Sequence, residues 1–358
     1  MAPLCREYGI STKTGWKFFE RFKRLGLVGL ADQSRAPREI PHRTAPELVR
    51  LLVAGRKQHP TWGPKKLKEV LERKHKREFP AASTIGDILG REGLVEPRRQ
   101  RPRHRATPTR LHVASEPNDV WGIDYKGQFK LGNGTYCFPL TLSDHFSRFI
   151  LGCEAMARIS EDSARDVCED IFREYGLPRA IRSDNGAPFA STGLAGLTKL
   201  SVYWMQLGIR LERIRPGHPE ENGRHERMHR TLKFDTTKPP RINMLQQQER
   251  FDMFVTEFNN DRPHEALAMK APAKMYRRSP RPYPDSIPMP TYKGYDDVRR
   301  VGLGGFLTVS RKTCVYVSRA LEDMYVGVNE LPGNRWFLAF MNLDLGIVQD
   351  GRLMPLTA

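Results

Sequence analysis

A basic, proline-containing segment divides this chain into parts with different patterning. Residues 96–110 read EPRRQRPRHRATPTR and contain three prolines. Five arginines lie between positions 98 and 105: Arg98, Arg99, Arg101, Arg103 and Arg105. So few side chains here are apolar that the segment cannot build a core, which predicts an extended linker over 96–112. Because guanidinium groups pair well with phosphate oxygens, we expect these arginines to contact a phosphate backbone; a merely solubilising linker is the alternative.

The whole chain is strongly basic. It has 59 Lys and Arg against 41 Asp and Glu, a net charge of +18 over 358 residues. Such a surplus favours polyanionic partners, nucleic acid before acidic membranes. No apolar run approaches the roughly 18 residues that span a bilayer, and no signal peptide is evident. The five cysteines are scattered without a CxxC pair, which argues against disulfides and Cys-based zinc fingers. We expect a cytoplasmic protein without a membrane partner.

Helical periodicity predicts an N-terminal helix-turn-helix unit over 1–44. After a break at Gly9, Ser11 is a candidate N-cap for a basic helix that stops at Gly26. In a helix-turn-helix, the second helix enters the DNA major groove. The residues expected on its exposed, DNA-facing side are Lys13, Thr14 and Lys17. An ordinary helical hairpin with solvated lysines is the alternative.

A similar pattern predicts a second helix-turn-helix-like unit over 45–95. A helical stretch at 47–56 is followed by WGPKKLKEVLERK, with Pro64 early in the next helix. Ser83 is a candidate N-cap for a third helix, which ends at Gly93. Two such units in tandem could read a longer DNA site than one.

Strand patterns begin after the linker and predict an α/β domain over 113–278. In 119–126 apolar and other residues alternate, and Asn133-Gly134 marks a hairpin turn before a second strand. A third strand follows, then helices at about 160–175 and about 194–207 that alternate with short strands, and two final helices. This order predicts a mixed sheet. We expect Trp121 and Trp204 in its core, and Asp144 as a turn-stabilising carboxylate.

The C-terminal part has a different pattern. Residues 279–295 are proline-rich and predict a second linker. Residues 296–358 contain several short apolar stretches separated by glycines, which is typical of short strands joined by turns. The sequence therefore predicts a small C-terminal β-barrel.

Three carboxylates of the α/β region are candidate metal ligands. Asp124 lies in the first strand, Asp184 follows the short strand AIRS, and Glu226 lies in a helix that Asn222 could cap. Three such groups at one sheet edge cannot all stay ionised without a cation, and hard oxygen ligands suit Mg²⁺ or Mn²⁺. Taken singly, each could be a solvated strand residue, a turn former or a helix-surface partner for Arg230.

Four blocks of sequence strengthen the metal interpretation: WGIDYKG, IRSDNGAPF, IRPGHPEENGRHERMHRTLK and FNNDRPHEAL. Over about 118–278 they resemble the integrase catalytic core of bacterial insertion-sequence transposases, the Asp-Asp-Glu group related to retroviral integrases. The resemblance implies an RNase H-like fold. It also implies that Asp124, Asp184 and Glu226 bind two Mg²⁺ ions, replaceable by Mn²⁺, for DNA end cleavage and strand transfer.

The chain departs from the family pattern in two places. Many members separate the second Asp and the Glu by thirty-five residues, which would select Glu220. We prefer Glu226, because the family places its Glu a few residues after Asn-Gly and residues 222–226 read NGRHE. The first helix-turn-helix also starts almost at Met1, so its leading helix looks shorter than in relatives.

The same glutamate belongs to a competing motif. Residues 225–229 read HERMH and fit H-E-x-x-H, the zinc metalloprotease helix, with Glu249 as a possible third ligand. The helix also carries Arg224, Arg227 and Arg230, whose charges would oppose zinc binding. We expect instead that one face of this helix meets DNA phosphates, through His225, His229, Arg230 and Lys233.

The predicted function is that of an insertion-sequence transposase in the bacterial cytoplasm, associated with the nucleoid. Its partners would be double-stranded DNA, both the element's terminal repeats and the target, and a homo-oligomer would handle paired ends. A DNA-binding regulator with a decayed core and a plain nuclease are the alternatives, since fold does not imply function.

Overall fold

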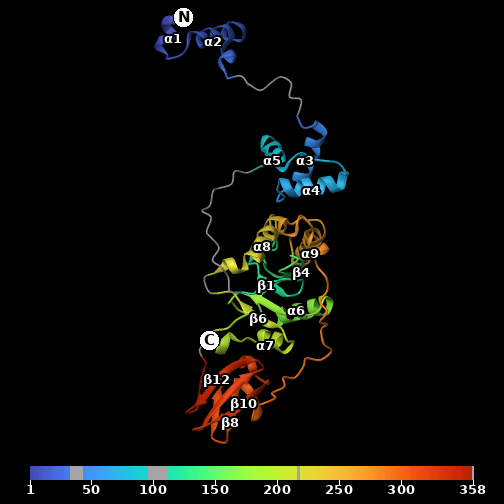
Figure 1. Cartoon of the computed structure of the whole chain (residues 1–358), viewed down its shortest axis with the longest axis vertical. Helices are drawn as coiled ribbons and strands as arrows, with labels where there is room; N and C mark the ends of the chain where they lie inside the picture. Colours follow the sequence, from blue (N-terminus) through green and yellow to red (C-terminus); the bar gives the residue numbers. More distant parts are fainter. Residues whose placement is uncertain (33–42, 96–110, 216–217, 357–358) are drawn as a thin grey trace. The chain divides into compact units, whose positions relative to one another are not determined.

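The computed structural model describes residues 1–32, 43–95, 111–215 and 218–356 (Figure 1). The chain forms two compact units, Met1–Val49 and Arg50–Ala358, which are described separately. The five linker arginines at 98–105 lie outside the described residues, so their expected phosphate contacts stay a prediction. Within the described residues, no helix combines the length and the apolar character needed to cross a membrane.

Local capping explains the helices of the N-terminal unit. Helix α1 (Ala2–Glu7) precedes α2 (Thr12–Leu25), and a 3-10 turn, η1 (Gly26–Leu30), follows. The Ser11 hydroxyl accepts a hydrogen bond from Thr14 N at 3.1 Å, as expected for an N-cap. Gly26, with φ of 65°, ends α2 in a conformation that a side chain would disfavour. Both predicted helix boundaries are confirmed.

The apolar side of α2 stays largely exposed within this unit. Trp16, Phe19 and Phe22 are 52%, 37% and 44% exposed. Among the described residues of Met1–Val49, only Cys5, Gly15 and Gly29 are buried. The described part of this unit therefore has the predicted helices, but their apolar side chains do not form a buried core.

Three helices form the second helical region: α3 (Pro46–Gln58), α4 (Pro64–His75) and α5 (Ala82–Arg91). Pro64 is the first residue of α4, where its missing N–H costs no helical hydrogen bond. The predicted Ser83 cap is wrong. Ala81 is the N-cap of α5, so the helix starts at Ala82, before Ser83, and no side-chain hydrogen bond caps it.

A mixed sheet is the centre of the α/β domain. Its strands are β1 (Val120–Tyr125), β2 (Phe129–Lys130), β3 (Tyr136–Asp144), β4 (Ile150–Met156), β5 (Ala180–Ser183) and β6 (Arg210–Arg213). Strand β3 pairs with β1, β2 and β4 in antiparallel fashion, whereas β1, β5 and β6 are parallel. The mixed sheet is confirmed, and the predicted order βββαβαβαα differs from the structure only by the two-residue strand β2, which adds a fourth strand before the first helix of this domain. This arrangement agrees with an RNase H-like core.

Helices cover both faces of this sheet (Figure 1). They are α6 (Glu161–Tyr175), α7 (Lys199–Gln206), α8 (Gly223–Thr236) and α9 (Met244–Asn260). Residues of α6 and α7 join one apolar cluster with Trp121 and Leu142, and residues of α8 and α9 join another with Cys137 and Cys153. Helix α7 is shorter than predicted, because a 3-10 turn, η2 (Leu194–Gly196), precedes the Thr198–Ser201 capping box that starts it.

Three smaller predictions about this domain are confirmed. Trp121 and Trp204 are 0% and 1% exposed, so both belong to the core. The Asp144 carboxylate accepts hydrogen bonds from Asn118 N at 2.8 Å and from Ser147 N at 2.7 Å. It thereby joins the turn after β3 to the segment that enters β1.

The C-terminal strands do not close into the predicted barrel. A five-stranded antiparallel sheet contains β7 (Asp297–Arg300), β10 (Tyr325–Leu331), β11 (Arg335–Phe340), β12 (Leu343–Gln349) and β13 (Arg352–Met354). The hairpin of β8 (Phe306–Ser310) and β9 (Thr313–Tyr316) is a separate two-stranded sheet. Side chains of both sheets, Val309, Val315 and Leu338 among them, share one apolar cluster. The core is thus enclosed by two sheets whose edges do not pair.

Short 3-10 turns complete the described structure. They are η3 (Pro219–Asn222), η4 (Glu265–Leu267), η5 (Pro272–Lys274), η6 (Leu303–Gly305) and η7 (Arg319–Leu321).

Candidate active site

Two central strands turn their small and polar side chains toward α8. Trp121 and Ile123 of β1 join the apolar cluster under α6 and α7, so Gly122 and Asp124 lie on the opposite face. Asp124 is directly opposite Thr141 of β3 in the antiparallel pairing. The predicted alternation along β1 thus puts a carboxylate on the α8 side of the sheet.

The charge of Asp124 is disfavoured at this position. Burial raises its pKa to about 7, and the nearby negative charges of Asp184 and, to a smaller extent, Glu226 act in the same direction, while Lys126 opposes them. The charges of Asp184 and Glu226 therefore both act on Asp124. Asp184 follows β5, and its Oδ1 accepts a hydrogen bond from Gly186 N at 3.1 Å. Glu226 lies in the first turn of α8 and is exposed.

The type of donor in these three residues suits a divalent cation, but the ligand atoms of Asp124, Asp184 and Glu226 do not all lie within 4.8 Å of one another. Carboxylate oxygens are hard ligands, and a bound cation would relieve the repulsion that raises the pKa of Asp124. Of the neighbouring glutamates, Glu221 accepts hydrogen bonds from Arg215 Nε and Arg215 N, both at 2.8 Å, and is buried as a loop-stabilising group. The side chain of Glu220 lies outside the described residues.

His225 and His229 do not lie on an exposed DNA-facing surface, and that prediction is wrong. They are 1% and 3% exposed, because one turn of α8 presents both side chains to the polar face of the sheet. His225 Nε2 and His229 Nε2 lie 2.7 Å and 2.6 Å from the Thr141 hydroxyl. His225 Nδ1 lies 3.1 Å from Ser143 Oγ. Arg230 and Lys233, on the same helix, are exposed as predicted.

Burial keeps both imidazoles neutral. It lowers the pKa of His225 to about 3. It also lowers the pKa of His229 far below its usual range, with the neighbouring His225 and Lys126 as smaller causes. Neutral imidazoles can donate through one ring nitrogen and accept, or bind a metal, through the other.

Gly122 makes room for these imidazole rings. A Cβ atom at this position would lie 2.6 Å from His145 Nε2 and 2.9 Å from His225 Nδ1. Any larger residue would therefore force the rings apart. The sequence analysis missed Gly122, Thr141 and Ser143. The available signal was the alternation of Leu140 and Leu142 with two hydroxyl residues, which marks a strand with a polar, buried face.

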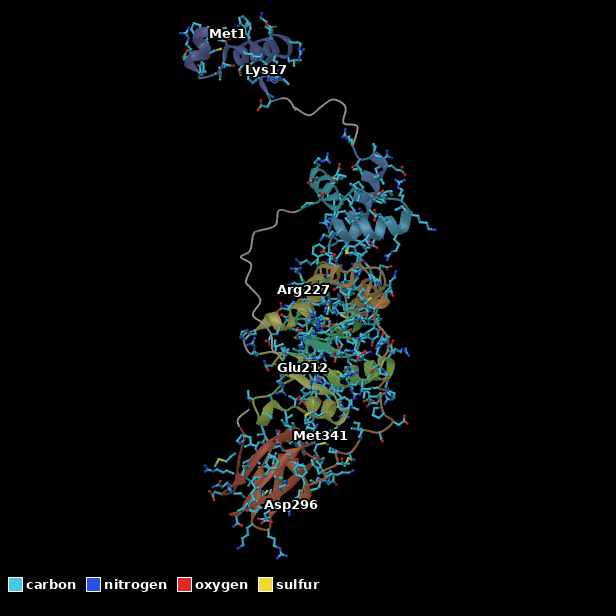
Figure 2. The ribbon with its side chains drawn as sticks, viewed as in Figure 1. Met1, Lys17, Glu212, Arg227, Asp296 and Met341 are labelled. Atoms are coloured by element: carbon cyan, nitrogen blue, oxygen red, sulfur yellow. The ribbon has the colours of Figure 1, made fainter. Side chains whose placement is uncertain are left out.

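A group of arginines lies beside the carboxylates. Burial, with the charges of Arg224 and Arg227 as smaller causes, lowers the pKa of Arg148 to about 10. Arg224 Nη1 donates a hydrogen bond to His145 O at 3.0 Å. Figure 2 labels Arg227, which is exposed on α8. Guanidinium groups held close together in this way favour a polyanion.

The two histidines of the H-E-x-x-H motif lie near Asp124 and not near Glu249, the third ligand that this motif predicted. Asp124, His225 and His229 have potential metal-binding atoms within 4.8 Å of one another. Glu249, the predicted third ligand, is exposed on α9 and is not part of this group. The motif's own glutamate, Glu226, is also exposed.

Two regions of the chain match known protein families. Residues 114–219 and 207–272 match two models described as integrase core domain, and residues 14–89 match a homeodomain-like domain. The Gag-Pol polyprotein of baboon endogenous virus (strain M7) is 29% identical over 178 residues, which cover 49% of this chain and 10% of that protein. The chain thus spans about a tenth of that relative's length. An uncharacterized 39.2 kDa protein of insertion element IS476, from Xanthomonas euvesicatoria, is 25% identical and covers 69% of this chain and 70% of that protein.

Solved structures are more distant. The intasome of simian T-cell lymphotropic virus, in complex with PP2A regulatory subunit B56 gamma, has 17% identity and a TM-score of 0.41, with coverage of 84% of this chain and 99% of that one. The integrase catalytic core domain of HTLV-2, in complex with magnesium, has 14% identity and a TM-score of 0.34, with coverage of 46% and 99%. Residues 114–219 and 207–272 thus match integrase core domain models, in agreement with the resemblance seen in the sequence.

Proposed function

We propose that this chain is a DNA transposase whose metal centre is formed by Asp124, Asp184 and Glu226. The observation that carries the proposal is the raised pKa of Asp124, which the charges of the other two carboxylates help to cause. Such a group of acids is stable in its ionised form only with cations, and oxygen ligands suit two Mg²⁺ ions, with Mn²⁺ as a substitute. Bound divalent cations would stabilise the attacking and leaving oxygens of a phosphoryl displacement.

Each of the three carboxylates is positioned by a different part of the fold. Asp124 is held by the central sheet, and Asp184 by the turn in which it accepts the Gly186 N–H. Glu226 is exposed at the start of α8, where a DNA strand can reach it. The proposed reaction cleaves the strand at an element end and transfers its 3′-OH strand to target DNA. No protein nucleophile is needed.

DNA binding is proposed for several basic surfaces. Lys13 and Lys17 are exposed on α2, whereas Thr14 is partly exposed and its hydroxyl lies 2.8 Å from Ser11 Oγ. Arg230 and Lys233 are exposed on α8, near the arginines that surround Arg148. These residues and the linker arginines would hold the element's terminal repeats and the target. Because two ends must be joined together, we propose a homo-oligomer on DNA.

Joining of DNA ends tests the proposal. A plasmid carrying candidate element ends is incubated with the full chain in Mg²⁺ or Mn²⁺. We expect nicked and joined products from the wild type and a loss of about 100-fold or more in Asp184→Asn, since removing one charge-stabilising group costs about that much. Asp166→Asn is the matched control, because Asp166 is exposed on α6.

Each alternative gives a different result in the same experiment. Nicking without joined products would indicate a plain nuclease. A wild-type protein that binds DNA but is as inert as Asp184→Asn would indicate a regulator with a decayed core. Joining that survives Asp184→Asn would remove the carboxylate centre from the proposal.

A further inference from the structure

The Thr141 hydroxyl is the centre of a buried polar network beside the proposed metal centre. Its Oγ1 lies 2.7 Å from His225 Nε2, 2.6 Å from His229 Nε2 and 3.1 Å from the main-chain oxygen of Asp124. Thr141 and both histidines are at most 3% exposed. Buried polar groups must satisfy one another, so the hydrogen positions in this network are constrained.

Counting hydrogens assigns the tautomers of both histidines. A main-chain carbonyl oxygen can only accept, so the single hydrogen of the Thr141 hydroxyl goes to Asp124 O. The hydroxyl oxygen then accepts from its two other partners, which makes His225 and His229 donors through Nε2–H. In a neutral imidazole the other nitrogen is an acceptor. Both Nδ1 atoms therefore present a lone pair.

The two Nδ1 lone pairs have different surroundings. That of His225 faces the Ser143 hydroxyl at 3.1 Å, which can donate to it. That of His229 faces Asp124 Oδ2 at 3.5 Å, and once this carboxylate is ionised it has no hydrogen to donate. Two acceptors that face each other repel, unless a cation lies between them. His229 and Asp124 thus form a nitrogen–oxygen pair that favours a positive ion.

The separation of this pair suits a metal ion. Ligand atoms at about 2.1 Å from a tetrahedral ion lie roughly 3.4 Å apart, close to the distance between His229 Nδ1 and Asp124 Oδ2. The charges of Asp184 and Glu226 add to the attraction, whereas Lys126 opposes it, as the effects of these groups on Asp124 and His229 show. The net charge that these three neighbours contribute around the pair is therefore negative, which favours a cation.

We propose that His229 Nδ1 and Asp124 Oδ2 together hold one divalent cation, so that the metal centre contains a nitrogen ligand. A nitrogen ligand changes the choice of ion. Imidazole favours zinc and related transition metals, whereas Mg²⁺ prefers oxygen ligands alone. The centre therefore binds Zn²⁺, Co²⁺ and Mn²⁺ more tightly than Mg²⁺. This inference deepens the proposed function and shares Asp124 with it.

Spectroscopy of the metal-loaded full chain tests the nitrogen ligand directly. Metal-free protein is loaded with Mn²⁺ alone, without DNA, and pulsed electron paramagnetic resonance detects nitrogen bound to the ion. We expect a nitrogen coupling in the wild type and in His225→Gln, and none in His229→Gln. His225 is the matched control because it lies on the same helix, is equally buried and also contacts Thr141.

Binding affinities provide a second readout. Calorimetry with Zn²⁺ should show a loss of about tenfold or more in His229→Gln, since even residues that only orient a metal ligand contribute that much. The Mg²⁺ affinity should change less. Absence of nitrogen coupling in the wild type, or its loss in His225→Gln alone, would overturn the proposal. If His229→Gln does not fold, His229→Asn replaces it, with the same expected loss of the nitrogen coupling.

The outcome can be separated from that of the proposed function. Asp184→Asn should abolish joining of DNA ends while the nitrogen coupling persists. A wild type that shows the coupling but joins no ends would contradict the transposase function and leave the metal ligand in place. A wild type that joins ends without the coupling would do the reverse.

Discussion

The two faces of the central sheet are built from the same strands and differ in almost every other respect. On the face under α6 and α7, Trp121, Ile123 and Leu142 are completely buried in an apolar cluster. On the face under α8, Asp124 and Thr141 meet two histidines. The first face excludes water by packing, and the second holds polar groups that satisfy one another. The polar groups thus gather on the α8 side of the sheet, beside a second apolar cluster that residues of α8 and α9 form with Cys137 and Cys153.

The largest effect on stability should come from the apolar face. Leu142→Ala leaves a cavity in a cluster from which water is excluded, and we expect a loss of about 2–5 kcal/mol in the free energy of unfolding. The neighbouring Ser143→Ala removes one hydrogen bond to His225 on the other face, and should cost only about 1 kcal/mol. Urea denaturation of both variants measures the difference. Equal losses would show that the two faces contribute alike.

On the polar face, the charge of Asp124 should make stability depend on pH. Its pKa rises from 3.8 in the unfolded chain to about 7 in the folded one. Without divalent cations, the wild type therefore loses stability relative to Asp124→Asn as the pH rises from about 4 to about 7, by at most about 4 kcal/mol. The comparison cancels the contributions of the histidines, which both proteins share.

Saturating Mg²⁺ is the control for this pH dependence. Cations that bind the wild-type carboxylate should remove or reverse the advantage of Asp124→Asn above pH 7. A stability difference that stays constant between pH 4 and pH 8 would contradict the raised pKa of Asp124. The measurement is thermal or urea unfolding of both proteins at each pH.

The sequence predicted what depends on local order and missed what depends on distant contacts. Alternation in 119–126 placed Asp124 opposite the apolar side chains, and the Ser11 and Gly26 signals gave the limits of α2. The network could not be predicted, because it needs the pairing of Asp124 with Thr141 and the docking of α8, residues 17 and 88 positions apart. The arginines around His225 and His229 led to the prediction that both histidines are exposed, but packing of α8 against the sheet buries them.

The prediction of a C-terminal barrel was wrong for a related reason. Short strands separated by turns were predicted correctly, but closure of a barrel depends on whether the edge strands β7 and β13 pair with a neighbour. In this fold the β8–β9 hairpin remains a separate sheet, and side-chain packing joins the two sheets instead. No local pattern distinguishes these outcomes.

A smaller effect than that of Leu142→Ala should come from the Thr141 hydroxyl, which joins the groups of the polar face. Thr141→Val keeps the shape of the side chain but leaves two imidazole Nε2 atoms and Asp124 O without their shared partner. Unsatisfied buried groups cost about 1–3 kcal/mol, which urea denaturation can measure. Thr141→Ser retains the hydroxyl and should recover most of that loss. Because the hydroxyl also fixes the tautomer of His229, Thr141→Val should weaken Zn²⁺ binding, whereas Leu142→Ala, on the opposite face, should not. A Thr141→Val protein with unchanged zinc affinity would show that the Thr141 hydroxyl does not fix the tautomer of His229.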